Sequence, residues 1–343
     1  MTGHPRRSTR AAGLAAALLA AALVASCAGG QRLPAAVEGS APPTTEAPPA
    51  TTYTCPADQQ EAANLTPKSY EPESRLQQPG SFPDGSTMAA IEAKGKLTIG
   101  VSADTLLFGA RNPQTGFIEG FDIDMLKEVA RAIFGESLSD EEVYGLLDIV
   151  VIPYSQRIPK LRSGEVDIVA HTMTINCVRW QQIAFSSEYY RSGQRVMVEA
   201  TSSFQSIDDL AAAQAVVCVP AGSTNEEKLL ADYPQIDAVA LPDISDCLVA
   251  LQAGEVQAIT GDDTVLAGLQ VQDPATKVVG DNFTFEPYGL GIAAERVDFV
   301  RFVNAVLQEM RDDGRWQQVY DKWLLATLGA ATPPPARYGR VSQ

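Results

Sequence analysis

The apolar run Val166-Asp167-Ile168-Val169-Ala170 has the length and the β-branching of a buried strand. Two hydroxyl side chains, Thr172 and Thr174, follow it, and Arg179 comes five residues later. Because open α/β sheets bind ligands at the carboxyl ends of their strands, we expect these three side chains to face one site. A guanidinium can grip a carboxylate through two parallel hydrogen bonds, and hydroxyl and carbonyl oxygens can accept from an ammonium group. The stretch therefore predicts a site for a free α-amino acid.

Short β-branched runs alternate with helical patterns along the rest of the chain. Between the first two runs, residues 121–134 carry apolar side chains at helical spacing, and Asp122 could cap this helix. This alternation predicts parallel βα units and an α/β fold with doubly wound sheets. The predicted strands are 97–101, 148–152, 166–170, 194–199, 216–219 and 256–260.

The loop Gly222-Ser223-Thr224 lies between the predicted strand 216–219 and a helical run at 226–231. Free N–H groups and a hydroxyl at a helix N-terminus favour an anion. We therefore expect this loop to bind the other side of the carboxylate that Arg179 holds. A helix cap without a ligand is the alternative.

Several short motifs occur in a fixed order from about Leu97 to Leu325. In this order they resemble the polar amino acid-binding proteins of bacterial ABC importers, which have the two-lobed type 2 periplasmic binding fold. Within that family the likeness is greatest to actinobacterial glutamate/glutamine-binding lipoproteins. The motifs are LTIGV at 97–101, GFDID at 120–124, RIPKL at 157–161, SGEVD at 163–167, FS at 185–186, GST at 222–224, GEV at 254–256, DD at 262–263, PYG at 287–289, DGRW at 313–316 and KW at 322–323.

The resemblance implies two lobes, each a mostly parallel sheet flanked by helices. Lobe 1 would comprise 87–192 and 290–328, and lobe 2 would comprise 193–289. The chain would cross between them near Ser192-Gly193 and near Tyr288-Gly289, where glycine tolerates changing dihedral angles. Two crossings make a hinge, so a ligand bound between the lobes would close them.

Asp262 and Asp263 follow the predicted strand 256–260. By the family's spacing, the resemblance implies that Asp262 binds the ammonium group and that Asp263 supports it. The alternative is that both only cap a helix that starts near Thr264.

The resemblance also assigns the end of the site that meets the ligand's side chain. Tyr154 matches an aromatic ring that packs on the ligand's aliphatic part, although an ordinary half-buried tyrosine is the alternative. Arg157 matches an arginine that reaches the side-chain carboxylate in relatives that bind acidic amino acids, unless it is a solvated helix residue. Ser102 and Asp104 are expected to close this end. L-glutamate or L-aspartate is the expected ligand, with the amides L-glutamine and L-asparagine weaker.

The first residues are typical of a secretory signal peptide. Arg6, Arg7 and Arg10 precede an apolar run from Ala11 to Ala25, which is shorter than the roughly 20 residues that span a membrane. The following Cys27 resembles the lipidated first residue of a lipoprotein, so we expect a signal peptide at 1–26 and a membrane anchor at Cys27. A secreted protein with a coincidental cysteine is the alternative.

Residues 27–86 are rich in Pro, Thr, Ala and Ser, a composition that predicts a disordered tether. Residues 329–343, with three consecutive prolines, are expected to form a disordered tail. Without the three arginines of the signal peptide, the formal net charge of −16 becomes −19. Such an acidic protein repels phosphate backbones, so nucleic acid is not expected as a partner.

Four cysteines remain beyond Cys27, and an even number in an exported chain suggests disulfides. Of the three possible pairings we favour Cys218 with Cys247 and Cys55 with Cys177.

Other functional classes stay open at this stage. The architecture implied by the resemblance is similar to that of some exported dehydratases, so an enzyme is an alternative. After signal removal, however, His171 is the one histidine of the chain, so neither a histidine metal cluster nor a metal cofactor is expected. A sensor lipoprotein is another alternative: it would bind the amino acid with the same clamp, formed by Arg179, Thr172, Thr174 and Asp262, and report to a membrane protein. We expect a monomeric binding protein without cofactors, with an ABC permease or a membrane-embedded sensor as its partner.

Overall fold

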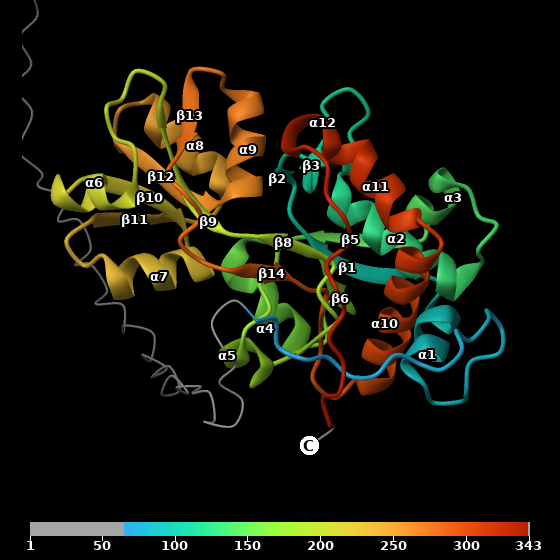
Figure 1. Ribbon diagram of the computed structural model, residues 1–343. Helices are drawn as coiled ribbons and strands as arrows, with labels where there is room; N and C mark the ends of the chain where they lie inside the picture. Colours follow the sequence, from blue (N-terminus) through green and yellow to red (C-terminus); the bar gives the residue numbers. More distant parts are fainter. Residues whose placement is uncertain (1–64, 342–343) are drawn as a thin grey trace, which may run out of the picture. The chain divides into compact units, whose positions relative to one another are not determined.

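The computed structural model describes residues 65–341 of the chain, which contain two five-stranded sheets with helices on their faces (Figure 1). The first, in lobe 1, has the order β5-β1-β6-β15-β7, and the second, in lobe 2, has the order β11-β10-β12-β9-β13. This architecture confirms the two-lobed α/β fold. The strands of the first sheet are β5 (Leu147–Val151), β1 (Leu97–Val101), β6 (Ile168–Val169), β15 (Gly291–Ile292) and β7 (Ala184–Phe185); those of the second are β11 (Asp237–Leu241), β10 (Val216–Pro220), β12 (Ala258–Asp262), β9 (Gln194–Glu199) and β13 (Thr276–Val279).

Helices cover the sheets of both lobes, and four of those described belong to lobe 2. A small sheet, β2 (Asp104–Thr105), β3 (Gly109–Arg111) and β4 (Ile118–Glu119), completes lobe 1. Its helices are α1 (Thr87–Lys94), α2 (Phe121–Phe134), α3 (Asp140–Gly145), the 3₁₀ turn η2 (Tyr154–Gln156), α4 (Arg157–Arg162), α5 (Cys177–Trp180), α10 (Val297–Asp312), α11 (Arg315–Trp323) and α12 (Leu325–Leu328). Those of lobe 2 are α6 (Ile207–Ala212), α7 (Thr224–Asp232), α8 (Ile244–Gln252) and α9 (Asp263–Gln272).

Each sheet has one strand that runs against the other four. In lobe 1 this strand is β15, antiparallel to both β6 and β7. In lobe 2 it is β9, antiparallel to both β12 and β13. The remaining strands of each sheet run in one direction, so their carboxyl ends meet at one edge, where ligands of such sheets bind.

Two short strands join the lobes. β8 (Tyr190–Ser192) and β14 (Glu286–Tyr288) pair antiparallel, with Ser192 opposite Glu286. The expected crossings at Ser192-Gly193 and Tyr288-Gly289 lie directly beside these strands. At Gly193 a Cβ atom would lie 2.6 Å from the side chain of Asn282, so the close packing there admits only glycine.

Apolar side chains form one core in lobe 1 and two in lobe 2. The lobe 1 core joins the sheet to α1, α2, α10 and α11. In lobe 2, one cluster lies under α8 and α9 and the other under α6 and α7, as expected for a sheet covered on both faces. Tyr154 of lobe 1 belongs to the cluster under α8 and α9, so the two lobes share packing at this point.

Residues 65–86 and 329–341 differ from the expected disordered tether and tail. Tyr70, Leu76 and Phe82 are buried in the lobe 1 core, and Ser69 pairs with Tyr338 in a parallel β-bridge. The Pro- and Thr-rich composition hid these few apolar anchors, which bury enough surface to order the segment.

Asp122 does not cap α2 as expected. Gly120 precedes the helix without a side-chain cap, and the Asp122 carboxylate instead accepts from the hydroxyl of Tyr189 at 2.6 Å and from the N–H of Thr172 at 2.9 Å. Burial raises the pKa of Asp122 to about 6, against the lowering effect of these bonds.

The signal peptide, the lipidation site Cys27 and the cysteine Cys55 lie outside the described residues. No helix between residues 65 and 341 is long and apolar enough to cross a membrane.

Candidate functional site

Polar residues follow strands of both sheets at their carboxyl ends. Between the lobes, Thr174 Oγ1 lies 3.3 Å from Thr224 Oγ1, which brings the ends of the two sheets together. Most of the site residues predicted from the sequence therefore lie around one place. Four of them lie at or just after strand ends: Ser102 after β1, Thr172 after β6, Gly222 after β10 and Asp262 at the end of β12.

Glu286 on β14 links the two threonines. Its Oε2 accepts from Thr174 Oγ1 at 2.6 Å and from Thr224 Oγ1 at 2.8 Å, so one carboxylate of the hinge connects lobe 1 with lobe 2. Glu286 was not among the site residues predicted from the sequence. Its position directly before the crossing at Tyr288-Gly289 is the one signal that could have drawn attention to it.

Arg179 lies on α5 with a buried side chain. Its Nη1 donates to the carbonyl of Thr174 at 3.0 Å, and the structure gives it no ion pair among residues 65–341. Burial lowers its pKa, whereas the nearby carboxylates of Glu227, Glu286 and Asp262 raise it. A buried cation needs an anionic partner, and the remaining N–H groups of this guanidinium suit the two oxygens of a ligand carboxylate.

Arg157 is also buried, and it too forms no ion pair within residues 65–341. Burial and the charge of Arg179 lower its pKa to about 9. Its guanidinium differs from that of Arg179 because most of its N–H groups already bond to the backbone. The acceptors are the carbonyls of Tyr154 at 2.9 Å, His171 at 3.1 Å, Thr172 at 3.5 Å and, across the lobes, Gly222 at 3.4 Å.

Asp262 is buried at the start of α9. Its carboxylate accepts from Asn225 Nδ2 at 2.8 Å and from the hydroxyl of Tyr288 at 2.5 Å, two partners that sequence analysis did not identify. Burial, together with the negative charge of Glu286, raises the pKa of Asp262 to about 7. A positively charged group placed beside Asp262 and Glu286 would relieve their mutual repulsion.

Asp263 serves the hinge. Its carboxylate accepts from Ser192 Oγ at 2.5 Å and from Asn282 Nδ2 at 2.9 Å, both next to the crossing into lobe 2. These bonds connect Asp263 to the hinge, and its support of the ammonium site stays a prediction.

The loop before α7 caps this helix and touches the other lobe. Ser223 Oγ accepts from the N–H of Glu226 at 3.1 Å and donates to the carbonyl of Pro220 at 2.6 Å. Gly222 has a φ of +77°, and a Cβ atom there would lie 2.7 Å from the Cα of Ser155. Only glycine allows this contact between the lobes.

Ser102 and Asp104 form a small network at the end of β1. Ser102 Oγ donates to Asp104 Oδ1 at 2.6 Å, and Asp104 Oδ2 accepts from the N–H of Ser245 at 3.0 Å. Because Ser245 lies in the first turn of α8, this carboxylate of lobe 1 caps a helix of lobe 2.

Tyr154 packs its ring 4.5 Å from that of His171 and 4.8 Å from the guanidinium of Arg157. His171 Nε2 lies 3.0 Å from the carbonyl of Ile152, and burial lowers the pKa of this histidine to about 3, so the ring is neutral. A histidine held in this way packs rather than reacts.

Thr172 has a φ of +42°, in the left-handed region that β-branched residues rarely adopt. The bond from its N–H to Asp122 holds this conformation. Backbone strain of this kind clusters at binding sites.

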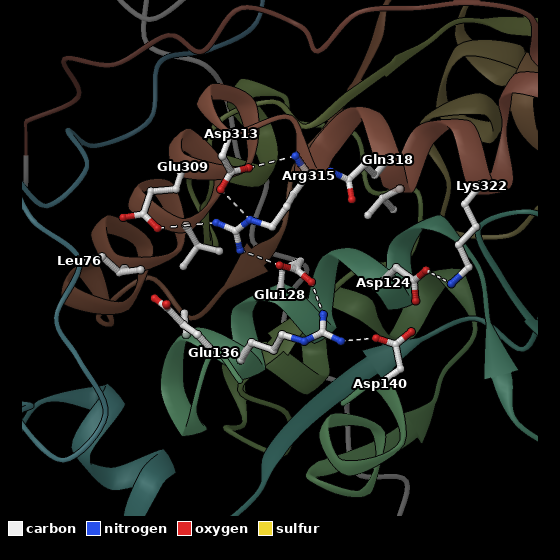
Figure 2. Close-up of a pocket in the computed structure, with 14 residues that line it drawn as sticks. Leu76, Asp124, Glu128, Glu136, Asp140, Glu309, Asp313, Arg315, Gln318 and Lys322 are labelled. Carbon is white, nitrogen blue, oxygen red and sulfur yellow. Dashed lines mark hydrogen bonds and ion pairs between the residues drawn. The ribbon is translucent and has the colours of Figure 1, made fainter. Parts of the chain in front are cut away.

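A different feature forms the pocket shown in Figure 2, with a cavity volume of about 600 Å³. Its charges pair with one another: Glu128 bonds to both Arg131 and Arg315, and Lys322 lies 2.6 Å from Asp124. None of the clamp residues lines it, so we do not identify it with the amino acid site. Its lining comprises Leu76, Asp124, Glu128, Arg131, Ala132, Glu136, Asp140, Val306, Glu309, Asp313, Arg315, Gln318, Val319 and Lys322.

A disulfide joins Cys218 of β10 to Cys247 of α8, as expected. The pairing of Cys177 with Cys55 stays a prediction, because Cys55 lies outside the described residues. Among residues 65–341 no group of three His, Cys, Asp or Glu side chains could hold a metal ion.

Comparison with known proteins places these observations among transport proteins. The model of bacterial extracellular solute-binding proteins, family 3, matches residues 97–326. The ABC transporter glutamine-binding protein GlnH of Bacillus subtilis is 33% identical over 69% of this chain and 84% of its own length. The glutamate-binding protein GluB of Corynebacterium efficiens is 32% identical over 67% of this chain and 79% of its own.

A solved structure of an amino acid-binding protein is also similar to this chain. An ancestral arginine-binding protein bound to glutamine is 29% identical, with a TM-score of 0.61, over 69% of this chain and 99% of its own.

Proposed function

The chain belongs to the bacterial extracellular solute-binding proteins of family 3, and from that premise we propose that it binds an L-α-amino acid between its lobes and delivers it to an ABC importer. One observation carries the proposal. The buried guanidinium of Arg179, without an ion pair among residues 65–341, lies near the buried carboxylates of Asp262 and Glu286. One cation beside two anions suits a zwitterion, whose carboxylate and ammonium groups meet opposite charges.

The α-carboxylate would bind Arg179 together with the N–H groups that begin α7 at Thr224. The ammonium group would bind Asp262, with Glu286 and Thr174 as neighbours that also accept hydrogen bonds. Each buried charge of the site then has a partner, which is the condition under which buried charges are tolerated.

We propose L-glutamate as the preferred ligand, with L-aspartate next. Support comes from Arg157, a second buried guanidinium whose pKa is lowered partly by repulsion from Arg179. A dicarboxylate adds a negative charge that relieves this repulsion. Because Arg157 already bonds to four carbonyls, we propose that it acts mainly through its charge and the N–H groups still unused, rather than through a two-bond clamp.

L-glutamine is the second candidate. Asp104 could accept from a side-chain amide, and a relative at 33% identity is named for glutamine. A carboxylate at this point would favour the amide over the acid.

Isothermal titration calorimetry with glutamate, aspartate, glutamine and asparagine separates the two candidates. We expect glutamate to bind most tightly and Arg157→Gln to reduce its preference over glutamine by about 1 to 3 kcal/mol. Exposed Arg162→Gln, on the same helix, is the control. If Arg157→Gln leaves the ranking of the four ligands unchanged, Arg157 does not read the side chain.

Delivery to an importer also requires that the amino acid leaves unchanged, which sets the proposal apart from a dehydratase. Mass spectrometry of the ligand released after incubation should recover the amino acid alone. Recovery of a deaminated or dehydrated product would support an enzyme instead.

We further propose that Cys27 is lipidated and holds the mature protein at the outer face of the cytoplasmic membrane. The charged start, the short apolar run and the cysteine after Val24-Ala25-Ser26 support this. Cys27→Ser should release the protein into the medium after signal removal. Identification of the membrane protein that copurifies with the ligand-bound protein would distinguish a permease from a sensor as its partner.

A further inference from the structure

Two segments outside the family-matched residues 97–326 pair with each other on lobe 1. We call residues 66–70 and 337–340 the collar. The N–H of Ser69 donates to the carbonyl of Arg337 at 2.9 Å, and the N–H of Arg340 donates to the carbonyl of Ser69 at 3.0 Å. These bonds form one parallel β-bridge, between Ser69 and Tyr338, near the two ends of the described chain (Figure 1).

The collar is fastened to the framework of lobe 1. Ser69 Oγ donates to the carbonyl of Phe185 on β7 at 2.8 Å. Asn304 of α10 is fully buried and donates to both Ser69 Oγ and the carbonyl of Tyr70 at 2.8 Å. The β-bridge of the collar therefore has a fixed position relative to the sheet.

From this position the collar holds Trp180. The Trp180 ring meets Tyr70 edge-on at 5.9 Å and Phe185 at 5.6 Å, and the guanidinium of Arg340 lies over it at 3.9 Å. Two of these three contacts come from the collar. An aromatic ring with a cation on its face and other rings at its edges has little freedom to move.

Trp180 directly follows Arg179 on α5, a helix of four residues. So short a helix is not stable alone and depends on tertiary contacts for its position. The Asn176 side chain caps the start of α5 by accepting from the N–H of Arg179 at 2.8 Å, and the ring contacts of Trp180 lie at its other end.

We propose that the collar positions Arg179 through Trp180, so that the carboxylate clamp depends on chain segments that lie outside the family's common fold. Arg340, Tyr70 and Trp180 are positioning residues: they act on the ligand through Arg179 and do not touch it. This inference rests on the proposed function of Arg179. Because every α-amino acid has the same α-carboxylate, a displaced Arg179 weakens all ligands by one factor.

Calorimetry on three variants of the full mature chain tests the inference, with glutamate and glutamine as ligands. Arg340→Ala should raise Kd for both ligands by the same factor, roughly threefold to tenfold. Arg340→Lys keeps a cation over the ring and should recover most of the affinity. Arg75→Ala is the control: Arg75 is exposed and follows the N-terminal segment of the collar, so this variant should bind like the wild type.

The unfolding temperature of the ligand-free variants separates positioning from stability. If Arg340→Ala lowers this temperature but leaves Kd unchanged, the collar has a structural role only and the inference is wrong. A change confined to glutamate would also overturn it, since Arg179 meets the group that both ligands share. If the wild type binds no amino acid, the proposed function itself fails and the collar inference falls with it.

Discussion

Buried charge without an oppositely charged contact distinguishes Arg179 and Arg157 from the paired arginines of lobe 1, such as Arg131 and Arg315. Each of the latter contacts carboxylates, which compensates its charge within the protein. Among residues 65–341, Arg157 donates hydrogen bonds to backbone carbonyls only, and Arg179 donates its side-chain hydrogen bond to a single carbonyl. Burying two guanidinium groups without a carboxylate partner costs free energy. A bound anion that pairs with them offsets this cost.

Arg179→Ala should nearly abolish amino acid binding, because the α-carboxylate loses its cation in a buried site. The expected loss is about 2 to 5 kcal/mol, or roughly thirtyfold to several thousandfold in Kd. Calorimetry with glutamate measures it. Arg179→Lys should bind at an intermediate level, since it keeps the charge but loses the two-bond geometry. Wild-type affinity in Arg179→Ala would remove this residue from the clamp.

The pH dependence of binding should follow Asp262. Its pKa in the folded protein is about 7, above the value of about 3.9 for an exposed aspartate, so folding favours its protonated form. The ligand's ammonium group favours the ionised form, so binding releases this proton. Affinity should therefore fall as the pH falls below 7, by roughly thirtyfold between pH 8 and pH 5.5.

Two variants check the source of this pH dependence. Asp262→Asn should bind weakly at every pH and show a flat profile. Asp122→Asn should keep the slope near pH 7, although Asp122 also titrates, near pH 6. His171 stays neutral throughout, because burial lowers its pKa to about 3. A profile that is already flat in the wild type would exclude Asp262 as the ammonium partner.

At the scale of single elements, loops and helix ends supply two of the tight contacts between the lobes. The loop between β10 and α7 touches η2 at Ser155, and the start of α8 meets Asp104 of β2. Loops at the carboxyl ends of strands are free to carry such contacts, because the sheet holds their ends in place.

Gly222→Ala should weaken ligand binding by roughly tenfold, since overpacking at a tight contact typically costs about 1 to 3 kcal/mol. Its methyl group would lie 2.7 Å from the Ser155 backbone and hold the lobes apart. Gly254→Ala is a matched control: its φ is +71°, but a Cβ atom there meets nothing within 4 Å. Both variants strain the backbone equally, so calorimetry isolates the contact. Equal affinities in the two variants would show that closure does not depend on Gly222.

At the scale of the whole molecule, distant parts of the chain meet in lobe 1. Asn304 accepts from the N–H of Ser187 at 2.6 Å while it donates to Ser69 and Tyr70. One buried amide thus joins α10, the segment after β7 and the N-terminal part of the collar. Segments from the start, the middle and the end of the described chain are therefore held together in lobe 1.

Asn304→Ala should lower the free energy of unfolding by about 2 to 4 kcal/mol, because it leaves buried polar groups without partners. Urea denaturation monitored by circular dichroism measures the change. Gln318→Ala, an exposed amide on α11, is the control and should change the stability by less than about 0.5 kcal/mol. A loss as small as the control's would mean that solvent replaces these three bonds without cost.

Patterns within a few residues of one another determined much of this protein. β1 and β9 span the predicted residues 97–101 and 194–199, and α2 spans 121–134, because the periods of strands and helices are local properties. The Ser223 cap and the disulfide between Cys218 and Cys247 could also be anticipated from residue type and order. Motif order along the chain indicated the two-lobed fold.

Tertiary structure alone decided which groups satisfy one another. The carboxylate of Glu286 meets hydroxyls 112 and 62 residues away. Asp122 bonds to Tyr189 and Thr172 instead of capping its helix, and residues 66–70 and 337–340 meet in a parallel β-bridge. No local pattern encodes such pairs, because a buried polar group forms its hydrogen bonds with whichever partner the fold places beside it. Arg157 shows the same limit: the resemblance implied a ligand contact, and in the fold its N–H groups bond to four carbonyls.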